Sequence, residues 1–229
     1  MYIVADVGSC HQGKWKYLTE LVDVAHFCGV DCVKLQLFGK EYEKEGNVCV
    51  NRDWVKPIFQ YAKEHNIAMS ASVFDNEALE IMFSMETPFV KFAYSNRYDP
   101  MVMGAMQRGM KCVVSTDPMS LSKVPEIVRN NPCYAPLFRL PGPPEMIYPT
   151  MVRTNYEGLF PPFIGLSDHS LGCTEAIEAA QFGCEFFEKH ITLNYNDITC
   201  PDAAFALKPK DLERYVKKLK FEAFGGING

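Results

Sequence analysis

The 229-residue sequence lacks the features that mark membrane, secreted and nucleic-acid-binding proteins. None of its apolar runs reaches the roughly 18 residues that a membrane-spanning helix requires. Residues 1–6 begin at once with a strand-like pattern, without the charged start and long apolar region of a signal peptide. The formal net charge is −5 and no Lys/Arg tract is present. We therefore expect neither a nucleic-acid partner nor an anionic membrane partner.

The sequence also lacks a CxxC pair, although it contains nine cysteines. This absence argues against zinc fingers and iron–sulfur clusters, and the odd number argues against a disulfide framework. Cysteine acts as a small hydrophobic residue in or beside apolar runs, the position of Cys28, Cys32, Cys112 and Cys184. Cys10 and Cys200 instead lie beside polar motifs, where a nucleophilic thiol is the less favoured alternative. The pattern indicates reduced thiols and hence a cytoplasmic protein.

A third absence concerns the glycine-rich turn of dinucleotide-binding folds. Residues 7–13 hold only two glycines, at the wrong spacing for GxGxxG, which disfavours an open doubly wound sheet. Instead, apolar runs with polar ends alternate with amphipathic helices, and we predict a single (β/α)8 TIM barrel over residues 1–222 with a flexible tail at 223–229. Pro136 predicts a short or irregular sixth strand. The predicted strands are residues 2–6, 31–37, 67–73, 89–93, 111–115, 134–139, 163–166 and 184–187.

The helices between these strands have recognisable start signals. Asp75 and Ser120 are predicted N-caps, the second for a helix reaching about residue 128. Asp99 followed by Pro100 opens another helix, and Pro144 is expected to open a short one after a loop at 141–144. The remaining predicted helices cover residues 16–27, 53–64, 174–182 and 209–219.

Two histidines close polar clusters at the ends of the last two predicted strands. His169 ends the segment Ser167-Asp168-His169, and His190 follows Glu188 and Lys189. A strand–helix–strand unit places the two imidazoles at neighbouring strand ends on one face of the barrel. Converging neutral imidazoles can bind a divalent transition metal. Ordinary hydrogen-bonded histidines at the barrel rim are the alternative.

Lysines and hydroxyls interrupt strands that are otherwise apolar. Lysine is rarely buried without a partner, so Lys34 and Lys91 require neighbouring negative charge. Salt bridges with barrel carboxylates would supply it. An anion such as a phosphate, held by the ammonium groups and by serine hydroxyls, is the other interpretation. The serines in question are Ser72, Ser115 and Ser167.

These segments together resemble the sialic acid synthase family. Residues 3–13, IVADVGSCHQG, are similar to the family motif AEIGxNHxG, and residues 29–36, GVDCVKLQ, to GADAVKFQ. Residues 113–116 are similar to ISTG, residues 165–169 match GLSDH, and residues 188–193 are similar to EKHFTL. Pro201 and Asp202 correspond to the PD of GPDH. The resemblance runs from about residue 3 to 219 in the same order and spacing.

The resemblance implies condensation of phosphoenolpyruvate with N-acetylmannosamine or a related amino sugar to a nonulosonic acid, with release of phosphate. It implies a divalent metal on His169 and His190, Mn²⁺ first and Mg²⁺ or Co²⁺ as alternatives. It places Asp6, Lys34 and Asp202 in catalysis. Phosphoenolpyruvate would be bound by Lys34, Ser72, Lys91, Ser115 and Ser167, and the sugar by Gln36, Asn96 and Asp202.

Departures from the family motifs fall mostly on the sugar side. The SGE segment reads Tyr94-Ser95-Asn96 here, which replaces a carboxylate by an amide. The HCTxxYP segment is replaced by residues 136–141, the asparagine of the first motif by Cys10, its glutamate by Asp6, and the histidine of GPDH by Ala203. We expect the family's C-terminal antifreeze-like domain to be absent, and a homodimer as one expected assembly.

Three functions therefore compete at the sequence level. The leading one is the synthase. The second is a catalytically weakened barrel that binds a sugar or an anion, or that partners another subunit. The third is a related phosphoenolpyruvate aldolase acting on a phosphorylated sugar, for which Arg97 and Arg139 would supply a second anion site.

Overall fold

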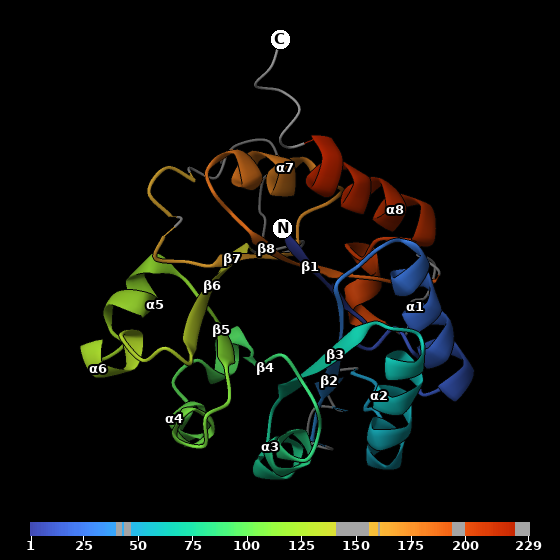
Figure 1. Cartoon of the computed structure of the whole chain (residues 1–229), viewed down its shortest axis with the longest axis horizontal. Coiled ribbons are helices and arrows are strands. Elements are labelled where there is room, and N and C mark those ends of the chain that lie inside the picture. Colours follow the sequence, from blue (N-terminus) through green and yellow to red (C-terminus); the bar gives the residue numbers. More distant parts are fainter. Residues whose placement is uncertain (40–42, 44–46, 141–155, 160, 194–199, 223–229) are drawn as a thin grey trace.

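The chain folds into a closed barrel of eight parallel strands, ordered as in the sequence (Figure 1). A computed structural model describes residues 1–39, 43, 47–140, 156–159, 161–193 and 200–222. The first strand pairs with both the second and the last, which closes the ring. The predicted barrel is thus confirmed. Its strands are β1 Tyr2–Asp6, β2 Cys32–Leu37, β3 Ala68–Val73, β4 Val90–Phe92, β5 Cys112–Thr116, β6 Tyr134–Leu140, β7 Gly165–Asp168 and β8 Phe186–His190.

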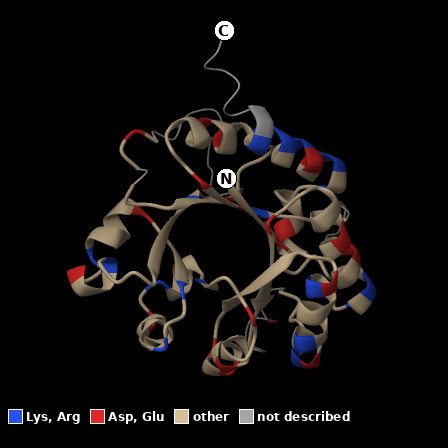
Figure 2. Cartoon of the chain, in the orientation of Figure 1, with Lys and Arg blue, Asp and Glu red and all other residues tan. Residues whose placement is uncertain are grey.

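Helices surround the ring of strands on its outer side (Figure 1). None of the described helices is both long and apolar enough to span a membrane. Figure 2 shows most charged residues on these helices and loops, while the strands carry few. The helices are α1 Trp15–Phe27, α2 Val55–Glu64, α3 Asn76–Phe83, α4 Pro100–Gln107, α5 Pro118–Ser122, α6 Glu126–Arg129, α7 Thr174–Gln181 and α8 Pro209–Lys217. Shorter turns are η2 Arg52–Trp54, η3 Tyr94–Asn96, η4 Pro201–Ala204 and η5 Lys218–Glu222.

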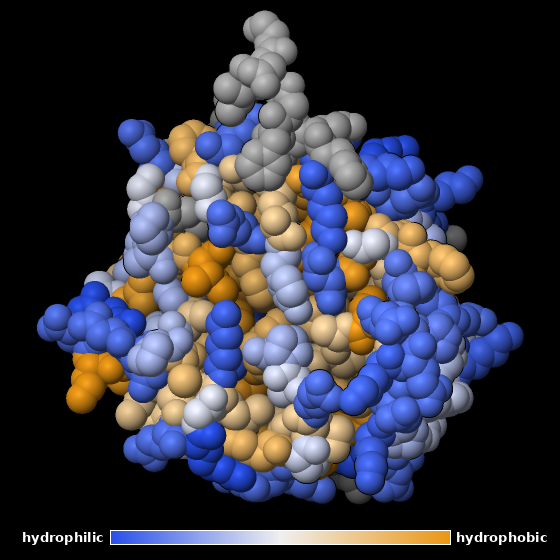
Figure 3. Space-filling view, viewed as in Figure 1, coloured by the Kyte–Doolittle hydropathy of each residue, from blue (hydrophilic) through white to orange (hydrophobic). Residues whose placement is uncertain are grey.

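Two apolar cores hold the barrel together. The larger one lies between the strands and the helices. The smaller one is built almost entirely from strand residues and fills the ring itself, so the barrel is a packed core and not a pore. On the face drawn in Figure 3, side chains cover the centre of the ring. Because strand side chains alternate between faces, Val4 in this inner core is followed two residues later by Asp6 on the same face. The inner-core residues are Val4, Cys32, Phe89, Val113, Ala135, Leu137 and Phe186.

The segment between β5 and β6 differs from the prediction. One helix starting at Ser120 was expected, but two short helices form, separated at Pro125. Asp117, not Ser120, is the N-cap of α5, and its carboxylate accepts the Ser120 backbone N–H at 2.8 Å. Proline cannot donate the backbone hydrogen bond that a continuous helix would need at residue 125.

The sixth strand is also longer and more regular than predicted. β6 pairs with β5 and β7 along its length, with Pro136 opposite Val114. The Pro136 carbonyl still accepts the Ile164 N–H at 2.9 Å, so proline removes only its own donor from the ladder. The loop and helix expected at residues 141–144 and the tail expected at 223–229 lie outside the described residues.

Candidate active site

Polar side chains from strands around the ring meet at the carboxyl end of the barrel. The strand register places Asp6 level with Lys34 on one side and with His190 on the other. Ser72 is level with Lys91, and Ser167 with Glu188. The residues expected to bind phosphoenolpyruvate are all buried, with Lys34 only 1% exposed and Lys91 only 3%. Two linked clusters account for nearly all of them.

The first cluster is centred on the Asp6 carboxylate. Its Oδ2 atom accepts hydrogen bonds from Lys34 Nζ at 2.6 Å and from Gln36 Nε2 at 3.0 Å. Its Oδ1 atom accepts the backbone N–H of Gly8 at 3.0 Å. Lys34 also donates to the Ser72 hydroxyl at 2.8 Å. Asp6, Lys34, Ser72 and Gln36 therefore form one hydrogen-bonded group, as the sequence predicted for their position on one face.

The second cluster is centred on Glu188, which the sequence reasoning placed on this face but gave no role. Its Oε1 atom accepts from the Ser167 hydroxyl at 2.8 Å and from Lys91 Nζ at 3.2 Å. Its Oε2 atom lies 4.0 Å from Lys34 Nζ, which joins the two clusters. Lys91 also donates to the Ser115 hydroxyl at 2.7 Å. An acidic residue inside an apolar strand was the available signal for this role.

Burial and neighbouring charge act in opposite directions on these groups. Burial lowers the pKa of Lys34, but the charges of Asp6 and Glu188 outweigh it and leave that pKa raised. For Lys91 burial wins over Glu188, and the pKa falls below its ordinary value. Burial alone would raise the pKa of Glu188, yet Lys91 and Lys34 hold it well below its usual range. The two lysines are thus paired with carboxylates, as the salt-bridge interpretation anticipated.

The clusters still leave hydrogen-bond donors for a ligand. An ammonium group has three N–H donors. Lys34 gives one to Asp6 and one to Ser72, and Lys91 gives one to Ser115 and one to Glu188, so among the described residues each retains one. Ser72 and Ser115 act as acceptors, and within the described part of the chain their own O–H groups have no acceptor. The Ser167 O–H, by contrast, is taken by Glu188.

The two predicted metal-binding histidines lie side by side. Their ring centroids are 5.4 Å apart, and the Phe205 ring contacts both edge-on. His169 Nδ1 lies 2.9 Å from the Leu140 carbonyl, so this nitrogen carries the proton and leaves the Nε2 lone pair available. Burial lowers the pKa of His169 to about 4, with the neighbouring His190 acting in the same direction. The ring is therefore neutral near pH 7, as a metal ligand must be.

His190 also has a nitrogen available. Its Nδ1 atom is buried and has no hydrogen-bond partner within the described ranges, and it lies 3.8 Å from Asp202 Oδ2. Its Nε2 atom is 3.5 Å from Asp6 Oδ2. No group of three or more His, Cys, Asp or Glu in metal-binding geometry occurs among the residues that the structure describes. The described residues thus offer two neighbouring imidazoles, each with a nitrogen lone pair available to a ligand.

The predicted sugar-binding residues lie at the edge of these clusters. Asp202, in η4, accepts the backbone N–H of Ser9 at 3.4 Å, next to His190. A Cβ atom at Gly8 would come within 2.4 Å of Asp202 Oδ2, so this close approach requires glycine. Asn96, in η3, accepts the Ser95 hydroxyl at 2.6 Å and makes no hydrogen bond to either cluster in the described structure.

The arginines considered for a second anion site both stack on one tyrosine. The guanidinium carbon of Arg97 lies 3.8 Å from the centre of the Tyr94 ring, and that of Arg139 lies 5.3 Å from it. Tyr94 donates its hydroxyl to Asp117, the cap of α5. The structure therefore brings both arginines to the barrel rim close to Asn96.

Cys10 and Cys200 come together although 190 positions separate them. Both are buried, and the Cys10 thiol is hydrogen-bonded to Cys200 and to the Thr192 side chain. The hydrogen bond to Cys200, with burial, raises the pKa of the Cys10 thiol far above its ordinary value. A nucleophilic cysteine requires the opposite shift. The geometry favours the small hydrophobic role for Cys10.

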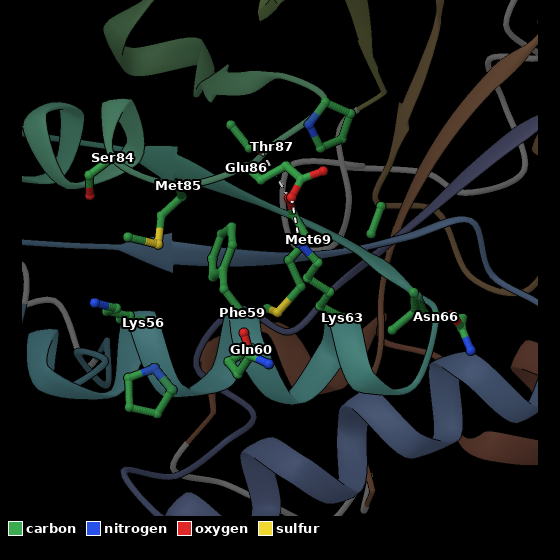
Figure 4. Close-up of a pocket in the computed structure, with 14 residues that line it drawn as sticks. Lys56, Phe59, Gln60, Lys63, Asn66, Met69, Ser84, Met85, Glu86 and Thr87 are labelled. Carbon is green, nitrogen blue, oxygen red and sulfur yellow. Dashed lines mark hydrogen bonds and ion pairs between the residues drawn. The ribbon is translucent and has the colours of Figure 1, made fainter.

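A cavity of about 980 Å³ lies away from these clusters, between α2, the start of β3 and residues 84–88 after α3 (Figure 4). Phe59, Met69 and Met85 line it, and an ion pair between Lys63 and Glu86 at 2.8 Å lies beside it. None of the predicted site residues reaches it. Its size alone does not make it the active site, because the chemistry-bearing side chains converge elsewhere.

Known proteins resemble the chain over nearly its whole length. It is 25% identical to the human (Homo sapiens) N-acetylneuraminate-9-phosphate synthase, an alignment that covers 96% of this chain and 69% of that protein. It is 26% identical to the spore coat polysaccharide biosynthesis protein SpsE of Bacillus subtilis, covering 96% and 67%. It is 24% identical to the pseudaminic acid synthase of Helicobacter pylori, covering 95% and 73%.

Solved structures agree on the fold. The N-acetylneuraminic acid synthetase of Leptospira borgpetersenii superposes with a TM-score of 0.82 at 20% identity, covering 95% of this chain and 82% of that one. SpsE of Bacillus subtilis gives 0.77 at 23% identity, covering 95% and 66%. The chain spans about two thirds of the length of several of these relatives. The NeuB family model matches residues 39–131 and 141–224, most of the sequence, and the chain therefore belongs to the NeuB family.

Proposed function

We propose that this chain is a synthase that condenses phosphoenolpyruvate with N-acetylmannosamine or a related amino sugar, forming a nonulosonic acid and releasing phosphate. The proposal is supported by relatives named as N-acetylneuraminate-9-phosphate synthase and pseudaminic acid synthase. The nine free thiols are consistent with a reducing compartment, so we place the reaction in the cytoplasm.

The observation that carries the proposal is the set of donors that remain at the barrel end. Within the part of the chain that the structure describes, each of the two ammonium groups retains one N–H, and Ser72 and Ser115 each retain an O–H. Four donors from four neighbouring strands can surround the phosphate and carboxylate of phosphoenolpyruvate, and charge-assisted bonds from lysine are the strongest of these. As phosphate leaves, the same donors stabilise the negative charge that develops on its oxygens.

His169 and His190 would hold a divalent metal, Mn²⁺ first and Mg²⁺ or Co²⁺ as alternatives. When bound, such an ion would supply Lewis-acid polarisation of a sugar aldehyde. In the proposed reaction, carbon 3 of phosphoenolpyruvate attacks the aldehyde carbon of the open-chain sugar. Asp202 and Gln36 lie beside this position and can accept or donate hydrogen bonds to sugar hydroxyls. The cation left at carbon 2 is then captured by water before phosphate departs.

Release of inorganic phosphate tests the proposal. The protein is mixed with Mn²⁺, phosphoenolpyruvate and each of a panel of amino sugars, with sugar-free and metal-free mixtures as controls. We expect phosphate release that requires both the sugar and the metal, together with a nonulosonic acid detected by mass spectrometry. Phosphate release that is independent of sugar, or none with any sugar, contradicts a synthase.

A binding barrel without turnover is the second candidate. The observation that favours it is the pairing of Lys34 with Asp6 and of Lys91 with Glu188, which neutralises both of these lysines without a substrate. Calorimetric binding of phosphoenolpyruvate or sugar without phosphate release would support it.

Including phosphorylated sugars in the same panel tests the aldolase alternative, since Arg97 and Arg139 lie at the rim.

A further inference from the structure

The Glu188 side chain lies at the centre of the polar groups from four strands. It projects from β8 and is only 3% exposed. Its contacts come from β7 through Ser167, from β4 through Lys91 and from β2 through Lys34. Two of these partners, Lys91 and Lys34, each hold a serine hydroxyl in turn. Every residue expected to bind phosphoenolpyruvate is therefore connected to Glu188 directly or through one lysine.

Like charges and flexible side chains make such a cluster unstable without a common partner. Two buried ammonium groups repel each other, and lysine has four rotatable side-chain bonds through which it can turn away. A carboxylate between them attracts both ammonium groups, which offsets their repulsion and fixes where each one points. The Glu188 Oε1 atom takes one N–H of Lys91 and the O–H of Ser167, so the direction of the remaining Lys91 N–H is set.

We propose that Glu188 is the positioning residue of the anion site. It acts through Lys91, Ser167 and Lys34, and holds their donors in the arrangement that receives phosphate. Its second oxygen, Oε2, is buried without a hydrogen-bond partner in the described structure and faces Lys34 at 4.0 Å. The fixed oxygen is Oε1, and the position of that atom, more than the charge of the side chain, orders the site. The inference rests on the proposed phosphoenolpyruvate site.

Two substitutions separate position from charge. Glu188→Asp retains the charge but withdraws the carboxylate by one methylene, out of reach of Ser167 and Lys91. Glu188→Gln removes the charge but retains an oxygen at the place of Oε1. We expect Glu188→Asp to weaken the binding of inorganic phosphate and of phosphoenolpyruvate at least tenfold in calorimetry. We expect Glu188→Gln to weaken it less than Glu188→Asp does, because its side-chain oxygen still receives Lys91 and Ser167 although the charge is lost.

A matched control lies near the start of the same strand. Glu185 precedes β8 and its side chain is exposed, so Glu185→Asp makes the same chemical change away from the site. It should leave anion affinity unchanged. A purely structural role for Glu188 would shift the thermal midpoint of its variants without changing the anion affinity of the folded protein.

The opposite ranking overturns the inference. If Glu188→Asp binds phosphate as the parent does while Glu188→Gln does not, charge and not position orders the site. If both variants bind more tightly, Glu188 competes with phosphate. Lysine-ammonium NMR of the ligand-free protein supplies a readout that does not depend on the proposed function: we expect the Lys91 Nζ signal to persist in Glu188→Gln and to disappear in Glu188→Asp. A parent that binds no phosphate would end the proposed function, and the NMR comparison would still decide the positioning role.

Discussion

At the scale of single residues, the capacity of the barrel end to bind an anion depends on which hydrogen-bond donors already have a partner. Lys34 and Lys91 are each paired with a carboxylate, and each retains one donor that no described residue takes. The sequence predicted that both lysines are buried and need a negative partner, because lysine in an apolar strand has few alternatives. It could not assign the partners, since pairing depends on which side chains face each other across the ring.

The lysine donors give the first prediction. Replacing Lys34 or Lys91 by methionine retains most of the side-chain volume but removes a charge-assisted donor. We expect each change to weaken phosphoenolpyruvate binding by about 1.5–3 kcal/mol, measured by calorimetry. Lys63→Met is the control, because Lys63 is exposed and paired with Glu86 far from the site. If both site variants bind as tightly as the parent, the anion site lies elsewhere.

Metal binding is the second prediction at this scale. His169→Ala removes one of two neighbouring imidazoles and should abolish Mn²⁺ binding in calorimetry, with an unchanged circular dichroism spectrum. Removing the metal from the parent with a chelator should stop phosphate release in the same way. His26→Ala, on the exposed face of α1, should have no effect on either measurement. Unchanged Mn²⁺ affinity in His169→Ala would exclude the assignment.

His11 gives a prediction about pH. This histidine is fully buried, and its Nδ1 atom accepts the backbone N–H of Gly13 at 3.0 Å. Burial lowers its pKa to about 4, and the backbone of Val48 acts in the other direction with a smaller effect. Between pH 6.5 and 4 the unfolded chain therefore binds more protons than the folded one. The free energy of unfolding should fall as the pH drops through this window, by up to about 3 kcal/mol from His11.

His11→Asn isolates that contribution. An asparagine oxygen can accept the Gly13 N–H in place of Nδ1, but it does not titrate. Urea unfolding measured at pH 7 and at pH 4.5 should show a smaller loss of stability in His11→Asn than in the parent. His26→Asn, at an exposed position, should follow the parent curve. Identical pH dependence in parent and His11→Asn would contradict the assigned shift.

At the scale of elements, the starts of helices were predicted correctly where a single residue determines the N-cap. Asp75 caps α3 and Asp99 caps α4, as their sequence patterns indicated. The α5 prediction named Ser120, but the fold places Asp117, three residues earlier, at the cap, where it also accepts the Tyr94 hydroxyl. That tertiary hydrogen bond selects the earlier residue. Pro136 led to the prediction of a short or irregular sixth strand. That prediction was wrong because the hydrogen bonding between parallel strands tolerates one missing N–H donor.

The η3 turn gives the element-scale prediction. Asn96 stands where the family motif has a carboxylate, and charge-assisted hydrogen bonds to sugar hydroxyls are roughly twice as strong as neutral ones. N-acetylmannosamine should therefore be used poorly by the parent, and Asn96→Glu should raise its specificity constant. Asn130→Glu, an exposed amide at the end of α6, is the control. Efficient use by the parent, with no gain in Asn96→Glu, would mean that Asn96 does not contact the sugar.

At the scale of the whole molecule, the repeat of strand and helix was enough to predict a closed barrel and to gather the site residues on one face. It was not enough to identify Glu188 as the centre of that face. Each strand contributes one or two polar residues, and their order around the ring follows from register. Sequence gives the strand to which a residue belongs, but the vertical offset between strands is a property of the closed ring.

Strand register also identifies a position in the ring that is sensitive to an added side chain. Gly165 begins β7 and lies opposite Phe186 of β8, and the next inward pair along these strands is Ser167 with Glu188. A Cβ atom on Gly165 would lie 1.9 Å from the Phe186 carbonyl oxygen, so the two strands can approach only because this residue is glycine. Any side chain there must push β7 and β8 apart and so move Ser167 away from Glu188.

Gly165→Ala should therefore destabilise the barrel by about 3 kcal/mol or more in urea unfolding. Any folded fraction should bind phosphate weakly, because separating β7 from β8 breaks the hydrogen bond between Ser167 and Glu188. Gly104→Ala is the matched control: Gly104 lies in α4 with open space around its Cβ position, and alanine should stabilise that helix by up to about 1 kcal/mol. A Gly165→Ala protein with parental stability and phosphate affinity would show that β7 and β8 can separate without consequence for the site, and the link between barrel closure and the site would be wrong.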